Sequence, residues 1–117
     1  MKENIIKNKS FDFALRIVKL YQYLSESKKE VVLSKQLLRS GTSVGALVRE
    51  SEHAESRADF IHKLSIALKE ANESDYWIEL LYRSDYLAES EYQSLFSDLD
   101  EIIRLLVSII KTAKANK

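Results

Sequence analysis

The chain almost lacks the residues that make tight turns. Its 117 residues include no proline and only two glycines, Gly41 and Gly45. Hairpins and tight turns depend on these residue types, so a β-rich domain of this length would contain many of them. Leu, Glu, Lys, Ala, Ile and Ser dominate instead, and this composition favours helix. The sequence therefore predicts an all-α protein.

Length and composition limit the architecture further. Apolar residues make up 45% of the chain, enough to fill one core, and we expect residues 1–117 to form a single domain. There is no cysteine, which excludes disulfides, zinc–thiolate sites and thiol nucleophiles. No run of about 18 apolar residues suggests a membrane span, and the N-terminus lacks a signal-peptide pattern. We therefore expect a cytoplasmic protein without membrane contact.

Apolar residues recur every three or four positions in four segments, as in amphipathic helices. The predicted helices cover residues 6–25, 31–56, 58–84 and 90–114. Ser10 is a candidate N-cap in the first, and Ser56, with Asp59 three residues later, is the candidate cap of the third. Short connections favour an up-down-up-down four-helix bundle. The alternatives are an irregular three-helix packing and a helical pair completed by a partner chain.

The apolar stripes predict which residues face the core. In the first helix the expected stripe is Phe11, Ala14, Val18 and Tyr21, widened by Leu15, Ile17, Leu20 and Leu24. In the third it is Phe60, Leu64, Ala67, Ala71, Ile78 and Leu81. The fourth has the clearest pattern: Tyr92, Leu95, Phe96, Leu99, Ile102, Ile103, Leu106, Ile109, Ile110 and Ala113. Tyr76, Trp77 and Tyr82 form an aromatic cluster that suits either the core or a subunit interface.

The stretch SGTSVGA, residues 40–46, holds both glycines. The apolar phase continues through it without a jump, so we expect one unbroken helix. Glycine inside a helix costs about 1 kcal/mol relative to alanine, which favours close packing against another helix or subunit at Gly41 and Gly45. A local kink and a phosphate-binding loop are the alternatives. The loop is disfavoured because no lysine follows until Lys63.

The candidate chemical sites are sparse. Two carboxylate–histidine pairs, Glu50 with His53 and Asp59 with His62, have the spacing used by di-iron bundles. Both histidines are predicted to face away from the core, and both pairs lie near the connection between the second and third predicted helices. No serine has a partnered base. We therefore assign no catalytic, cofactor-binding or metal-binding residue and expect a non-enzyme. A carboxylate–histidine metal-binding bundle, including a metal-dependent enzyme, remains an alternative.

Charge is balanced overall but unevenly distributed. The chain has 18 basic and 18 acidic residues, yet residues 1–35 carry eight basic against four acidic and residues 70–105 carry two against ten. Such segregation suits either antiparallel neighbours of opposite sign or a partner surface. Nucleic-acid binding needs clustered cations, and the candidates are Arg16, Lys19, Lys35, Arg39 and Arg49.

The segment LLRSGTSVGALVRESEHAESRADFIHKLSIALKEANESDYWIELL, residues 37–81, carries a set of motifs that is specific as a set. Its motif residues are Ser40, Thr42, Ser43, Val44, Gly45, Glu50, Asp59, Phe60, Lys69, Glu70, Glu73, Tyr76 and Trp77. With the first-helix segment SFDFALRIVKLY, this pattern resembles the bacterial ribosomal-RNA intervening-sequence proteins over about residues 9–112.

The resemblance implies a non-enzymatic up-and-down bundle that assembles into a barrel-shaped homopentamer. A basic first helix and acidic third and fourth helices would suit heterologous contacts in such a ring. A related branch, the accessory protein of diversity-generating retroelements, binds nucleic acid and a reverse transcriptase through a basic surface. RNA or DNA is therefore the alternative partner, beside further copies of the chain itself.

Overall fold

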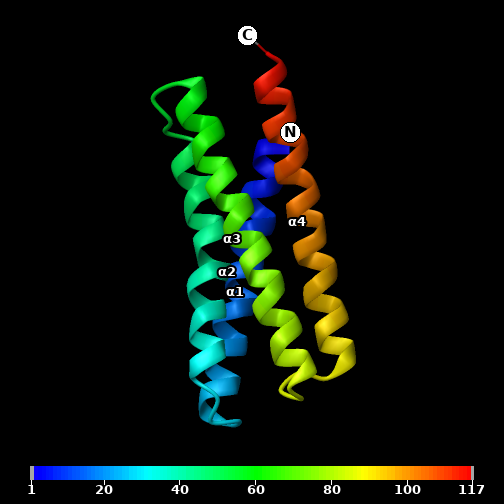
Figure 1. Ribbon diagram of the computed structural model, residues 1–117. Helices are drawn as coiled ribbons and strands as arrows, with labels where there is room; N and C mark the ends of the chain where they lie inside the picture. Colours follow the sequence, from blue (N-terminus) through cyan, green and yellow to red (C-terminus); the bar gives the residue numbers. More distant parts are fainter. Residues whose placement is uncertain (1, 117) are drawn as a thin grey trace.

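The computed structural model describes residues 2–116; residues 1 and 117, the ends of the predicted domain, lie outside it. It contains α1 (Lys2–Glu26), α2 (Val32–Ser51), α3 (Arg57–Arg83) and α4 (Glu89–Ala115), with no strand in these residues. In Figure 1 the helices run alternately up and down, with both chain ends at the same end of the bundle. Consecutive helices pack together and α4 closes onto α1. The predicted all-α, four-helix architecture is confirmed.

The helix boundaries differ from the predictions at two places. α1 begins at Lys2, so Ser10 is buried within the helix and the prediction that it caps the helix was wrong. α2 ends at Ser51, five residues before the predicted end at residue 56. Ser56 does cap α3, because its Oγ accepts the Asp59 N–H at 3.0 Å. Asp59 in turn accepts the N–H of Glu55 at 3.1 Å, so the chain reverses here without glycine or proline.

One apolar core runs through the bundle. It is formed by Ile6, Phe13, Ile17, Leu20, Leu24, Leu37, Val44, Val48, Leu64, Ala67, Ala71, Ile78, Leu81, Leu87, Leu95, Leu99, Ile102, Leu106, Ile109 and Ile110. The predicted stripe of α3 is buried except for the half-buried Phe60. In α4 the prediction fails at Phe96, which is exposed.

The central stripe predicted to face inward from α1 was wrong by about a third of a turn, whereas Ile17, Leu20 and Leu24, predicted to widen it, are buried. Phe11 and Val18 are exposed, whereas Phe13, Ile17 and Leu24 are buried. α1 is apolar on two faces, and the buried one includes the small polar Ser10, whose Oγ donates to the carbonyl oxygen of Lys7 at 3.2 Å. The centre of the predicted stripe is therefore left at the surface, while one of its predicted flanks enters the core.

α2 passes through both glycines as one helix and lies close to α1 there. A Cβ at Gly45 would lie 3.3 Å from the carbonyl oxygen of Ser10, and one at Gly41 would lie 3.0 Å from Cγ1 of Ile17. Neither glycine has a positive φ. The missing side chains therefore serve packing, since the backbone conformation itself does not require glycine.

Candidate interaction surface

A row of large apolar side chains points outward from α1. Phe11, Leu15 and Val18 are 48%, 48% and 38% exposed. Their spacing of four and three residues places them on one helix face, opposite the buried residues of α1. A contiguous exposed apolar surface of this kind marks an interaction site more often than isolated exposed side chains do.

A groove between α1 and α2 adjoins this row. Its volume is about 620 Å³, and it is lined by Phe11, Ala14, Thr42, Gly45, Ala46, Arg49, Glu50 and His53. Thr42, Gly45 and Ala46 of α2 line it with small side chains, which leave the groove open. The guanidinium carbon of Arg49 lies 5.4 Å from the ring centroid of Phe11, a cation–π contact at the polar end. We refer to Phe11, Leu15 and Val18 together with this groove as the α1–α2 face.

The motif residues on the other side of α2 connect it to α3. Arg39 forms ion pairs with Glu70, at 3.1 Å from Nη1 to Oε1, and with Glu73. The indole N–H of Trp77 donates to Oε2 of Glu73 at 2.9 Å. This hydrogen bond and that from Arg39 lower the pKa of Glu73. The cluster is therefore a charge-assisted bridge between α2 and α3.

The hydroxyl groups of the motif are satisfied inside the bundle. Oγ of Ser74 donates to Oγ of Ser40 at 2.9 Å, a buried contact between α3 and α2. Thr42 and Ser43 donate back to the carbonyl oxygens of Leu38 and Arg39, at 2.7 and 2.6 Å. Ser40 thus joins α2 to α3, whereas Thr42 and Ser43 bond within α2.

Replacing Arg39 with alanine should test the bridge. We expect a loss of about 1 kcal/mol of unfolding free energy, because the pairs are half-exposed but share one network. Trp77 is the only tryptophan of the chain, so its fluorescence in a urea titration reports both unfolding and the lost partner of Glu73. Arg83→Ala removes the exposed pair with Glu79 within α3 and is the control. Equal losses in the two variants would contradict a special role for Arg39.

Three of the five candidate nucleic-acid contacts are engaged by neighbouring side chains. Arg16 pairs with Asp98 of α4 at 2.7 Å, Arg39 reaches α3, and Arg49 lies over Phe11. Lys19 and Lys35 are exposed and form no ion pair within residues 2–116. Of the five cations, Lys19 and Lys35 are therefore the ones without an ionic or aromatic partner among the described residues.

Both carboxylate–histidine pairs lie around the connection between α2 and α3, outside the core. Glu50 is exposed at the end of α2, and His53 is exposed in the connection after it. Asp59 accepts the N–H of Glu55 and pairs with Lys63 at 3.3 Å, while His62 is exposed. In the described part of the chain no three His, Asp or Glu side chains are grouped so that they could hold a metal ion. None of its helices is long and apolar enough to cross a membrane.

Fold and surface together define a class: an up-and-down four-helix bundle with an internally bridged α2–α3 pair and an apolar outer face. The chain belongs to the family described as 23S rRNA-intervening sequence protein, which matches residues 2–108. The resemblance in the motifs is thereby confirmed.

A solved relative agrees in fold over nearly the whole chain. It is a protein of unknown function from the S23 ribosomal protein family of Bacteroides thetaiotaomicron VPI-5482, 59% identical, with a TM-score of 0.94. The similarity covers 95% of this chain and 99% of the relative. No curated protein matches the chain.

Proposed function

We propose that this protein is a non-enzymatic cytoplasmic scaffold that acts by assembling with itself into a ring. The observation that carries the proposal is the row Phe11, Leu15 and Val18 on the outside of a bundle whose core is already complete. Burial of apolar area is the main favourable term in association. This row is the surface of α1 that association would remove from water.

The charge distribution supports contact between unlike faces. Residues 2–51, which form α1 and α2, carry ten basic and five acidic side chains, a net charge of +5. Residues 52–116, which include α3 and α4, carry seven basic and 13 acidic side chains, a net charge of −6. Complementary potentials favour contact between the α1–α2 pair of one copy and the α3–α4 pair of another, and they disfavour contact between two pairs of the same charge. Heterologous contacts of this kind close into rings when the rotation allows, and we expect a pentamer because the family resemblance implies one.

The test is a mass measurement in solution. Light scattering at micromolar concentration should give about five times the 13.5 kDa of one chain. We expect partial dissociation at 1 M salt, where the Debye length falls to about 3 Å and the charge attraction is screened. A monomer at both low and high salt would overturn the proposal.

The same experiment with added RNA addresses the alternative function. An RNA-binding bundle would retain RNA with an affinity that falls log-linearly with salt concentration. A scaffold that only binds itself would not. Because Arg16 and Arg39 are already paired with acidic side chains and Arg49 lies over Phe11, we expect no retention of RNA at physiological salt.

A further inference from the structure

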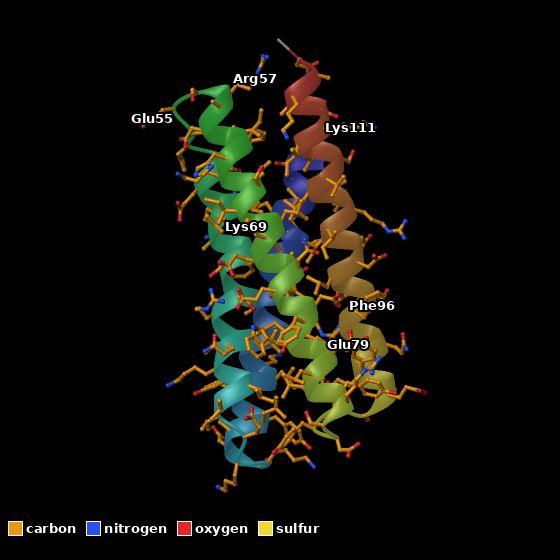
Figure 2. All side chains as sticks on the ribbon, viewed as in Figure 1. Glu55, Arg57, Lys69, Glu79, Phe96 and Lys111 are labelled. Carbon is orange, nitrogen blue, oxygen red and sulfur yellow. The ribbon has the colours of Figure 1, made fainter. Side chains whose placement is uncertain are left out.

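The α3–α4 side of the bundle has its own exposed aromatic surface. Phe96 is 40% exposed, and its ring centroid lies 6.3 Å from that of Tyr92. Tyr92 is stacked on Tyr82 of α3 at 4.3 Å. In Figure 2, Glu79 of α3 and Phe96 of α4 lie beside each other, toward the end where α3 and α4 are joined. α3 and α4 therefore form one aromatic surface with an acidic side chain, Glu79, beside it.

The carboxylates of this surface are only partly neutralised. Burial raises the pKa of Asp75, and the negative charges of Glu79 and Asp100 raise it further. Glu79 pairs with Arg83 at 3.0 Å and Asp100 with Arg104 at 2.9 Å, both within their own helices. Asp75 has no ion-pair partner among residues 2–116. We call Asp75, Glu79, Tyr92, Phe96 and Asp100 the α3–α4 patch.

The α1–α2 face has the complementary composition. Its apolar row is accompanied by Arg49, over Phe11, and by Lys19, which lies four residues after Leu15 and therefore on the same side of α1. Neither cation forms an ion pair in the described part of the chain. One surface thus presents apolar groups with unpaired cations, and the other presents aromatic groups with an unpaired carboxylate.

We propose that the α1–α2 face of one copy docks onto the α3–α4 patch of the next copy. Phe11, Leu15 and Val18 pack against Phe96, and Arg49 and Lys19 approach the carboxylates. This inference rests on the self-assembly proposed above and adds its direction. A twofold dimer through α1 would juxtapose two hairpins of net charge +5, whereas the unlike pairing joins +5 with −6. Each docked copy leaves one face free for the next, so the contact propagates until a ring closes.

Two substitutions that introduce a charge test which surface of one copy docks onto which surface of the next. Leu15→Glu spoils the α1–α2 face, and Phe96→Glu spoils the α3–α4 patch; both positions are exposed, so the fold should persist. We expect each variant alone to have the 13.5 kDa mass of a single chain. A 1:1 mixture should form a dimer, because the intact patch of the first variant meets the intact face of the second and no further copy can add. Val32→Glu, at an exposed apolar position outside both surfaces, is the control and should keep the wild-type mass.

The outcomes separate this inference from the proposed function. A monomeric wild type overturns both. A wild type that assembles together with an assembled Leu15→Glu overturns the docking face and leaves self-assembly standing. If Phe96→Glu keeps the wild-type mass, or if the mixture stays monomeric at the highest wild-type concentration, the pairing of these two surfaces is wrong. Circular dichroism melts of the three variants establish that each is folded.

Discussion

Replacing Gly45 with leucine is expected to lower the free energy of unfolding by about 1–3 kcal/mol through overpacking. The Cβ alone would lie 3.3 Å from the carbonyl oxygen of Ser10, which belongs to the backbone of α1. A backbone atom cannot rotate away as a side chain can, so the helices would have to separate. Separation would also weaken the contacts of the buried Phe13 and Val44.

Urea titration at neutral pH measures this loss, and Gly45→Ala is the matched control. Alanine adds one carbon at the same place and gains about 1 kcal/mol of helix propensity. Its net effect should therefore be much smaller than that of leucine. An unchanged midpoint in the leucine variant would show that α1 and α2 are not held together at this position.

The continuity of α2 through the glycines could be predicted because the spacing of apolar residues is a local property of the sequence. The apolar spacing from Leu37 to Val48 crosses both glycines unchanged, and α2 is one helix there. The cap of α3 was equally local, since Ser56 and Asp59 are three residues apart. The end of α2 at Ser51 was not visible, because no glycine or proline follows it.

The orientation of α1 could not be predicted for a different reason. A helix with two apolar faces gives no sequence signal for which one enters the core. The choice depends on Ser10 being small enough to face Gly45, a contact between positions 35 residues apart. The exposed row Phe11, Leu15 and Val18 is therefore recognisable as a candidate interaction surface only once the partner helix is in place.

The bridge between α2 and α3 shows the same limit. Arg39 was predicted as a nucleic-acid contact because it is a cation in a basic segment, yet Glu70 and Glu73 occupy its guanidinium. The two carboxylates lie more than 30 residues away in the sequence. The motif groups these residues in the sequence, but only the structure shows the reason. Arg39 forms ion pairs with Glu70 and Glu73, and Glu73 also accepts a hydrogen bond from Trp77.

Glu30 was missed altogether, because it lies in the polar connection SESKKE between α1 and α2. It is only 8% exposed, and its carboxylate accepts the N–H groups of Val32, Leu33 and Ser34 at 3.1, 3.0 and 2.8 Å. These are first-turn donors of α2 that have no partner within the helix. A carboxylate at a helix N-terminus also interacts favourably with the helix dipole. Glu30 therefore starts α2 in place of a usual serine or aspartate cap.

Replacing Glu30 with alanine should remove about 1–3 kcal/mol of stability at neutral pH, because three buried or half-buried donors lose a charged acceptor together. Burial raises the pKa of Glu30, but the backbone hydrogen bonds from Leu33, Ser34 and Val32 outweigh it, so the pKa is lower than the ordinary 4.5. A lowered pKa means that the folded state binds this proton less readily than the unfolded state. The stabilisation is then fully present above pH 4.5 and is lost as the pH falls through the folded-state pKa.

The measurement is the difference in unfolding free energy between wild type and Glu30→Ala, taken by urea titration from pH 7 downward. The difference should be largest at pH 7 and should shrink below pH 4.5 as the wild-type carboxylate becomes protonated. Glu30→Gln keeps one acceptor oxygen without the charge, so its loss relative to wild type should be smaller than that of alanine at pH 7. That loss should shrink over the same pH range, because the wild-type carboxylate titrates in both comparisons. If the alanine difference is the same at pH 7 and at pH 3, the stabilisation comes from packing of the buried side chain and not from the carboxylate bound to the start of α2.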